Sequence, residues 1–299
     1  MADKPSRGLV LYGDGLARSL NASARTGHLS SLASRSCCGF LSLPNAPTCE
    51  SEDERIVREF AVLLDACDHN AGDLSSTPSL ADRFMGMKTA VITTHSGIES
   101  LCRDQSISIF RLDRLVALES SHDDVPRELL KLLGFEGDRP LESSPFDLVF
   151  LHIGAGQQES ATNVEYLNYL VGSVMKIASP GSAIASRLHL SVAISYGPMK
   201  QDDSSRFSIQ MLKNEINPIF GSFIPHQSYT MRGETVRENV RHYCPMLLAQ
   251  LQDGVTRVDM AETFSFHEFK QNGGNLVIPA DRFLHEVSFK LWKAPKYGA

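Results

Sequence analysis

Short apolar runs alternate along this chain with amphipathic stretches, and this alternation limits the fold more than any other feature. The runs cover residues 8–12, 89–94, 106–112, 147–153 and 190–196, with a weaker one at 245–250. Most are continuously apolar, which predicts strands that are buried on both faces. Alternation of such strands with helices is typical of a parallel sheet covered on both sides. We therefore predict an α/β fold with a mostly parallel central sheet and helices on both faces.

Three stretches between the runs carry helix signals. Residues 52–68 place apolar side chains at helical spacing, and Ser51 with Glu54 before them matches a capping box. A second helix is expected from about residue 164 to 178, with Asn163 as its cap. A third is expected over residues 281–293, at the end of the chain.

Two other segments are polar and irregular, and they predict surface loops or insertions near residues 69–79 and 198–208. The sequence shows no internal repeat and no coiled-coil heptad. We therefore expect one α/β domain over residues 1–299.

The bulk composition excludes several classes of protein. With 299 residues, of which 42% are hydrophobic and 21% charged, the chain can bury a full core. Its net charge of -6 argues against a nucleic-acid surface, which needs clustered lysine and arginine. No apolar run reaches the roughly 20 residues that cross a bilayer, so we expect no membrane span.

The cysteines and the N-terminal residues bear on location. The six cysteines form no pair of the zinc-binding spacing, which favours free thiols in the cytoplasm. An organellar location is the alternative, because residues 17–43 are rich in serine and alanine, contain arginines and lack acidic residues. Against this alternative, the expected strand at residues 8–12 precedes that stretch and would be removed with it.

Several candidate site residues follow the expected strands, because ligands of open α/β sheets bind outside the carboxyl ends of the strands. Asp14 lies between two glycines, where a carboxylate can approach a metal or a phosphate closely; a turn that caps a helix is an equally good interpretation. Thr48 lies just before the helix expected at residues 52–68. A hydroxyl there suits a phosphoryl acceptor, although a purely structural role is favoured when the residue is taken alone.

His152, Gly154 and Gly156 form the next candidate. A histidine inside an apolar strand is more often a hydrogen-bonded core residue than a ligand. The two glycines give a tight strand exit, as a phosphate-binding or cofactor-binding turn would, but the remaining glycine of a dinucleotide fingerprint is absent. Ser195 and Tyr196 end another expected strand, where a simple turn explains them equally well.

Taken in order, these fragments resemble the alkaline-phosphatase superfamily, and most closely the cofactor-independent phosphoglycerate mutases. The resemblance rests on Asp14-Gly15 after the first strand, on residues 45–48 before a helix, on residues 81–92, on the strand that ends at His152, and on residues 237–248. It implies an alkaline-phosphatase-like fold, in which Thr48 corresponds to the nucleophile. The whole chain also resembles a family of plant proteins, which implies a plant origin.

The departures from this family concern its metal ligands. Two ligands that follow the His152 strand in the family correspond here to Gln157 and Ala161. A later Asp-His pair falls at Ser195-Tyr196, and the last histidine falls near Asn239. A two-metal site needs several carboxylates and imidazoles. Only Asp14 clearly matches a family ligand, with His242 as a weak substitute.

We therefore expect a metal-depleted, non-catalytic phosphatase-like protein without a cofactor, which binds an unknown protein or a small phosphorylated ligand. The alternative is a phosphoester hydrolase or phosphomutase dependent on a divalent metal, zinc (Zn) or manganese (Mn), with a site rebuilt from Asp14, Thr48, His152 and His242. A third hypothesis is a metal-free or cofactor-binding enzyme that uses the Gly154–Gly156 turn and a cysteine.

Overall fold

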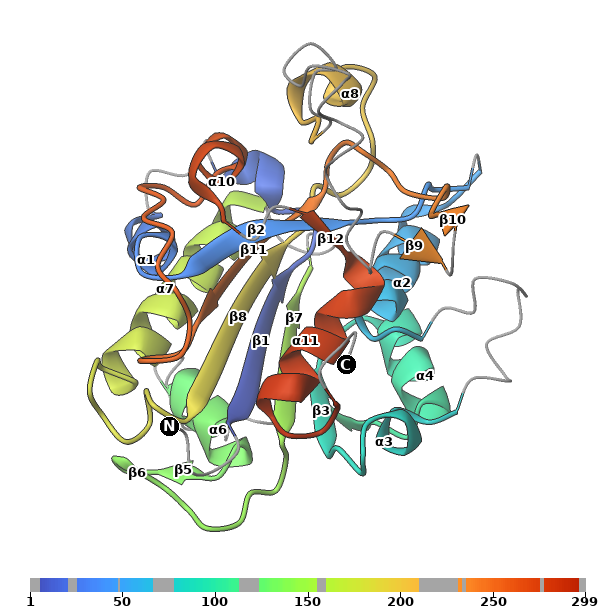
Figure 1. The fold of residues 1–299 in the computed structure, drawn as a ribbon. Helices are drawn as coiled ribbons and strands as arrows, with labels where there is room; N and C mark the ends of the chain where they lie inside the picture. Colours follow the sequence, from blue (N-terminus) through green and yellow to red (C-terminus); the bar gives the residue numbers. More distant parts are fainter. Residues whose placement is uncertain are drawn as a thin grey trace.

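The apolar runs assemble into one central sheet in the computed structural model, which describes residues 6–20, 26–47, 49–66, 78–112, 124–154, 160–209, 231–232, 235–274 and 277–295. The eight strands lie in the order β12-β2-β11-β8-β1-β7-β3-β4 (Figure 1). Their bounds are β1 (Arg7–Gly13), β2 (Cys37–Ser42), β3 (Thr89–Ile92), β4 (Ser108–Phe110), β7 (Leu148–Ile153), β8 (Leu188–Ile194), β11 (Met246–Leu251) and β12 (Val277–Pro279). Neighbouring strands are parallel except where β11 pairs with β2 and β8. The predicted mostly parallel sheet is confirmed.

Helices cover both faces of the sheet (Figure 1). One face carries α1 (Gly27–Ala33), α6 (Val125–Leu132), α7 (Ser160–Ile177) and α10 (Phe266–Asn272). The other carries α2 (Glu52–Leu63), α3 (Leu80–Arg83), α4 (Ser96–Asp104) and α11 (Phe283–Lys290). Each face has its own apolar core, because successive residues of a strand point to opposite sides: Leu9 and Leu11 belong to the first, and Val10 and Tyr12 to the second. The α/β prediction is confirmed in this respect too.

The remaining elements are short. They are β5 (Phe135–Glu136), β6 (Arg139–Pro140), β9 (Met231–Arg232), β10 (Thr235–Val236), α8 (Asp203–Arg206) and the 3-10 helices η1 (Ala17–Ser19) and η5 (Ala280–Arg282). Strands β5 and β6 pair with each other, as do β9 and β10. The helix α8 lies within the stretch that was expected to be a polar loop at residues 198–208. Residues 69–77 lie outside the described residues, and the single-domain organisation stays a prediction.

Local signals explain where the predicted helices begin. The capping box at α2 is present: the Ser51 hydroxyl accepts from the Glu54 amide, and the Glu54 carboxylate accepts from the Ser51 amide at 2.8 Å. The second predicted helix begins at residue 160, so Asn163 lies inside α7 and is not its cap. Its side chain instead donates to the carbonyl of Gly154 at 2.8 Å and ties the helix to the end of β7.

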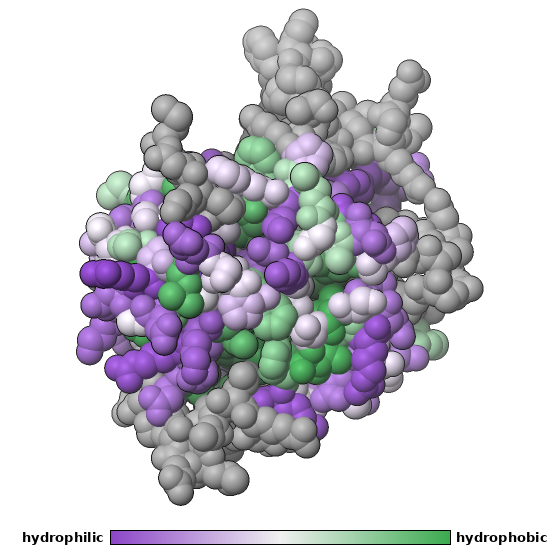
Figure 2. Space-filling model, turned by 90° about the horizontal axis from the view of Figure 1, so that it is seen from below, coloured by the Kyte–Doolittle hydropathy of each residue, from purple (hydrophilic) through white to green (hydrophobic). Residues whose placement is uncertain are grey.

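The surface mixes polar and apolar groups. Figure 2 shows small groups of hydrophobic residues among hydrophilic ones on the face seen from below. The most exposed large apolar side chains include Met85 at 67% and Trp292 at 55%. None of the helices in the part of the chain that the structure describes combines the length and apolar content needed to cross a bilayer.

Candidate functional site at the carboxyl ends of the strands

Four parallel strands end side by side and bring polar residues to one edge of the sheet. Strand β1 lies between β8 and β7, and β7 pairs with β3 on its other side. Asp14 follows β1, Thr93 follows β3 and Ser195 follows β8, while His152 is the penultimate residue of β7. All four are buried, with exposed fractions of 0%, 1%, 1% and 9%. The topology therefore makes a polar cluster inside the protein from residues that are far apart in the sequence.

Asp14 is the centre of this cluster. Its Oδ1 atom accepts from Arg55 at 2.9 Å and from the Ser195 hydroxyl at 3.1 Å, and the Tyr12 hydroxyl lies 3.4 Å away. The side chain does not cap the following helix, because η1 has no side-chain cap. Of the two interpretations open at the sequence level, the turn that caps a helix is therefore wrong. Asp14 is instead the acceptor in a buried ion pair.

Arg55 belongs to α2 and reaches the cluster through the packing of that helix on the sheet. Its guanidinium also donates to Glu59 at 2.8 Å and to Glu52 at 2.7 Å. Glu59 is 1% exposed, and Arg241 lies 3.7 Å from its second oxygen. Two buried carboxylates, Asp14 and Glu59, therefore share two buried arginines, which balances the charge of the network.

His152 faces Asp14 from the next strand. The Thr93 hydroxyl accepts from the His95 amide at 3.0 Å and lies 3.0 Å from His152 Nδ1. When this hydroxyl donates to Nδ1, the neutral ring carries its proton on Nε2. That atom lies 3.7 Å from Asp14 Oδ2, and neither atom has a hydrogen-bond partner among the described residues. The pair is thus oriented by its surroundings without being bonded.

The surroundings set the ionisation of these groups. Burial by itself would raise the pKa of the Asp14 carboxyl, but the neighbouring His152 ring and the charge of Arg55 bring this pKa below its usual value. Burial raises the pKa of Glu59, and the two arginines oppose this rise only in part. Burial, together with the Asp14 charge, raises the pKa of Tyr12 well above its usual value. Asp14 is therefore an anion and Tyr12 a neutral hydroxyl at neutral pH.

Two glycine turns close this edge of the sheet. Gly15 and Gly197 have φ values of 71° and 71°, in the region that disfavours other residues. A Cβ on Gly197 would lie 3.1 Å from the Gly15 Cα, so the two turns touch. The Gly15 amide donates to the Ser195 hydroxyl at 2.9 Å. This contact orients Ser195 toward Asp14.

The other predicted site residues lie elsewhere or outside the described residues. Thr48, Gly156 and Gln157 are outside them, so their predicted roles are not tested. Ala161 is exposed, in the first turn of α7. His242 is exposed as well, and its backbone carbonyl accepts from the amide of Ile209.

Several other residues near the strand ends have structural explanations. Asn239 accepts from the Asn45 amide at 3.2 Å, and Gly154 accepts from Asn163 as described above. His95 caps α4 through its Nδ1 atom, 3.4 Å from the Ile98 amide, which accounts for it structurally. Burial raises the pKa of Cys102 and Cys244 to about 12, which disfavours either thiol as a nucleophile.

The donors that the structure describes at this edge of the sheet do not suffice for a two-metal centre. Oδ1 of Asp14 is already engaged by the Arg55 guanidinium, which repels a second cation. In the part of the chain that the structure describes, only Asp14 Oδ2 and His152 Nε2 are metal-ligating atoms that face each other without a hydrogen-bond partner. Among the described residues, no group of three or more histidine, cysteine, aspartate or glutamate side chains is arranged to hold a metal.

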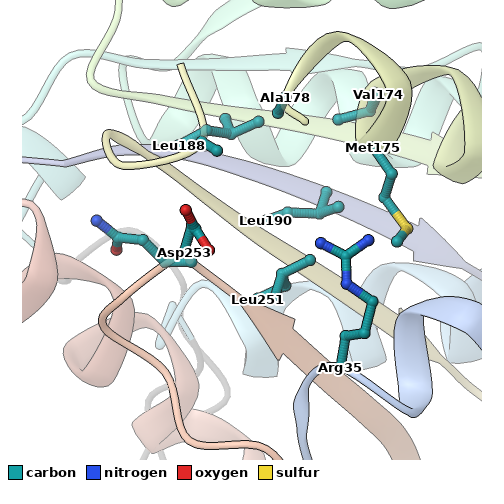
Figure 3. Close-up of a pocket in the computed structure, with 10 residues that line it drawn as sticks. Arg35, Val174, Met175, Ala178, Leu188, Leu190, Leu251 and Asp253 are labelled. Atoms are coloured by element: carbon teal, nitrogen blue, oxygen red, sulfur yellow. The ribbon is translucent and has the colours of Figure 1, made fainter. Parts of the chain in front are cut away.

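Two cavities lie away from Asp14. The first, near the N-terminal end of β8, has a volume of about 20 Å³, which is room for about one water molecule. Figure 3 shows Arg35 and Asp253 on opposite sides of its apolar residues Leu190 and Leu251. The second has a volume of about 440 Å³ and lies beside Tyr196, between η1, α8 and α10. Only this second cavity is in the size range of small-molecule sites.

The sequence interpretation missed Arg55, although one signal was present. Arg55 and Glu59 are separated by four positions and lie among the apolar residues of α2 that face the sheet, next to Ile56 and Phe60. A charged pair on the buried face of a helix requires a further partner, because charges are rarely buried unless they are paired. The identity of that partner, Asp14, depends on tertiary packing.

Comparisons with known proteins place the fold. The sequence matches no protein-family model and no curated protein. In structure, the chain is similar to the PH0037 protein from Pyrococcus horikoshii, with a TM-score of 0.58, 12% identity and 99% of each chain covered. It is also similar to the cofactor-independent phosphoglycerate mutase from Thermoplasma acidophilum, with a TM-score of 0.50, 10% identity, and 94% of this chain and 98% of that chain covered.

A protein in the alkaline phosphatase superfamily from Vibrio parahaemolyticus is a more distant match. Its TM-score is 0.47 at 10% identity, with 86% of this chain and 62% of that chain covered. At these identities a structural likeness establishes the fold and no activity. The expectation drawn from the sequence resemblance is confirmed at that level: the chain has an alkaline-phosphatase-like α/β fold, shared with a cofactor-independent phosphoglycerate mutase.

Proposed function

We propose that this chain is a non-catalytic phosphatase-like protein that acts in binding or scaffolding, with a protein or a small phosphorylated ligand as its partner. One observation carries the proposal: the carboxylate of Asp14 is neutralised by Arg55, at 2.9 Å, inside the protein. In this fold Asp14 corresponds to a residue that the phosphoglycerate-mutase resemblance assigns to metal binding. Here the positive charge that neutralises Asp14 comes from Arg55 of the same chain.

An arginine supplies charge without supplying the chemistry of a metal. A bound divalent ion has open coordination positions, through which it polarises a phosphoryl oxygen or activates water. The Arg55 guanidinium is held by Asp14, Glu59 and Glu52 and is 7% exposed as a side chain. Its donors are therefore directed at carboxylates of the chain. Arg55 therefore supplies charge at the point where the resemblance to the phosphoglycerate mutases implies a metal.

Access supports the same conclusion. Asp14 and Thr93 are 0% and 1% exposed, and the His152 side chain is 3% exposed. A phosphoester cannot reach these atoms without a movement of the surrounding residues. The cluster is therefore suited to holding the strand ends together. The cytoplasmic location and the plant origin predicted above belong to this proposal and await their own tests.

Metal titration of the purified protein tests the proposal. Calorimetric titration with zinc and with manganese is expected to show no tight stoichiometric site, and an aryl phosphate is expected to turn over no faster with either metal. Tight binding of one or two ions per chain that disappears in Asp14→Asn would overturn the proposal. The matched control is Asp104→Asn, at the exposed C-terminal end of α4, which should leave any titration unchanged.

One observation favours the alternative, a metal-dependent phosphoester hydrolase or phosphomutase. Asp14 Oδ2 and His152 Nε2 are buried, unpartnered and 3.7 Å apart, a separation that two ligands of one metal ion could have. This alternative predicts metal-dependent turnover that is lost in Thr48→Ala and in His152→Ala. Turnover that is unchanged in Thr48→Ala would exclude Thr48 as the nucleophile, and absence of turnover in the wild type would exclude the alternative itself.

A further inference from the structure

The cavity beside Tyr196 lies on the opposite face of the sheet from Asp14. Ser195 and Tyr196 are consecutive residues, so their side chains point to opposite sides at the end of β8. Ser195 contacts Asp14, whereas Tyr196 belongs to the core that α1, α7 and α10 cover. The cavity is therefore separate from the buried Asp14 cluster. Its volume of about 440 Å³ matches that of small-molecule sites.

Three aromatic rings line the cavity. The Tyr196 and Phe207 ring centroids are 4.6 Å apart, and those of Phe207 and Phe266 are 5.6 Å apart with an edge-to-face angle of 81°. Tyr196 is buried, while Phe207 and Phe266 are half-buried. Phe207 also lies under the Arg206 guanidinium, 5.7 Å from its ring centroid, and Phe266 also packs on Phe40, at 5.1 Å between centroids. The parts of the two half-buried rings outside these contacts can pack against another planar group. The lining therefore favours a ligand with an aromatic or other flat apolar part.

One wall of the cavity is rigidly built. Arg18 forms a bidentate pair with Asp203, at 2.7 and 2.5 Å, and also donates to the backbone carbonyls of Tyr196 and Pro198. The Lys200 amide donates to the same Asp203 carboxylate at 2.6 Å. Asp203 is 2% exposed. This network fixes the segment between β8 and α8 against η1, so the cavity does not depend on a loose surface loop.

The charges around the cavity favour an anion. Its lining contains the cations Arg18, Lys200 and Arg206 and the anions Asp202 and Asp203. Arg18 and Asp203 neutralise each other, and among the described residues no ion pair engages Lys200 or Arg206. The lining thus carries one excess positive charge in a chain whose net charge is -6. An acidic protein with a locally cationic cavity attracts anions to that place.

We propose that the cavity between η1, α8 and α10 binds a planar aromatic anion, which packs against the exposed parts of Phe207 and Phe266 and places its negative group beside Lys200 and Arg206. This inference names a ligand class for the proposed binding role. The two can fail separately, because metal binding at Asp14 would overturn the non-catalytic assignment without affecting this cavity on the other face of the sheet. The ligand class is a small carboxylate, sulfonate or phosphate that carries a flat apolar ring.

Fluorescence titration with two matched probes tests the proposal on the full chain. Anilinonaphthalene sulfonate carries the planar rings and the negative group, whereas phenylnaphthylamine has similar rings and no charge. We expect one sulfonate probe per chain, bound about fivefold more tightly than the neutral probe, because an accessible charge contact contributes about 1 kcal/mol. Equal affinity for the two probes, or many weak sites per chain, would overturn the proposal.

Variants assign the binding to this cavity. Lys200→Ala combined with Arg206→Ala should abolish the preference for the anionic probe while leaving the neutral probe unchanged. Phe207→Leu, which keeps the apolar volume but removes the ring, should weaken both probes. The charge control is Arg127→Ala with Lys131→Ala, two cations of α6 that are 76% and 67% exposed as side chains, and it should change neither affinity. Circular dichroism establishes that each variant is folded, and an effect of the control as large as that of the Lys200 and Arg206 pair would refute the assignment.

Discussion

Replacing Arg55 by methionine tests the buried ion pair most directly. Methionine keeps the apolar length of the side chain and removes its charge. The change leaves Asp14, which is 0% exposed, with the hydroxyls of Ser195 and Tyr12, at 3.1 and 3.4 Å, and His152 Nε2, at 3.7 Å, as polar neighbours. Glu59, at 1% exposed, loses its 2.8 Å partner at the same time.

The expected cost follows from these contacts. Two unit charges about 3 Å apart attract each other by about 5–6 kcal/mol at an effective dielectric constant of about 20. Removal of one partner from a buried pair typically destabilises a protein by about 3–5 kcal/mol. We expect Arg55→Met to lower the free energy of unfolding by about this amount at about pH 7. Urea denaturation followed by circular dichroism measures it.

The destabilisation caused by Arg55→Met should depend on pH in a defined direction. In the wild type the pKa of Asp14 is lowered, so its contribution to stability is present above the unfolded pKa and is lost as the pH falls through the folded pKa. Without Arg55, the pKa of Asp14 loses one of its two lowering influences while His152 remains, so this pKa rises relative to the wild type and Asp14 contributes less stability at neutral pH. Glu59, whose pKa burial already raises, acts in the same direction. The difference between wild type and Arg55→Met should therefore be smaller at about pH 5 than at about pH 7.

Two further variants complete the test. Adding Asp14→Asn to Arg55→Met removes the uncompensated charge, so the double variant should be less destabilised than the sum of the two single changes. Arg103→Met is the control, because that side chain is 65% exposed and its pair with Glu99 should contribute no more than about 1 kcal/mol. A cost below about 1 kcal/mol for Arg55→Met, or the same cost at both pH values, would refute the reasoning.

Two other predictions concern buried groups elsewhere. Thiol labelling at about pH 8 should modify the exposed Cys49 quickly, and Cys102 and Cys244 only on unfolding. The reason is that burial raises the pKa of Cys102 and of Cys244 to about 12, and the thiolate is the reactive form. Equal labelling rates for the three cysteines in the native protein would contradict this prediction. Arg18→Met should lower the free energy of unfolding by about 1–3 kcal/mol, because Asp203 loses a charged partner. Arg18 keeps the pKa of Asp203 low against the opposing effect of burial. The loss of stability caused by Arg18→Met, measured by urea denaturation, should therefore become smaller as acid protonates Asp203. A loss of stability that becomes larger in acid would exclude this explanation.

The central strands could be predicted from the sequence, and so could β11, whereas β2 could not. Residues 9–12 and 148–151 are continuously apolar, and the structure places β1 and β7 there. Strand β2 was not predicted, because Cys37–Ser42 contains a glycine and no β-branched residue and therefore gives no strand signal by itself. It forms through pairing with β11 and β12. Tertiary pairing overrides weak local propensity there.

The candidate site was predictable only as a set of strand ends. The sequence indicated that Asp14, His152 and Ser195 follow or end buried strands, and parallel pairing brings such positions together. It could not show that Arg55 would occupy the space beside Asp14, because this contact requires the packing angle of α2 on the sheet. When only the buried carboxylate of Asp14 is considered, a metal ligand is a reasonable interpretation. The position of Arg55 beside it favours a buried ion pair instead.

The place of β11 constrains the order in which the chain can acquire its structure during synthesis. This strand, Met246–Leu251, is inserted between β2 and β8, which are made of residues 37–42 and 188–194. The ribosome must therefore release most of the polypeptide before β2 can join the strands made after it. Until then β8 presents an unpaired edge to other nascent chains, which is a risk of aggregation. A chain truncated before residue 246 should expose this edge permanently and be a client of chaperones.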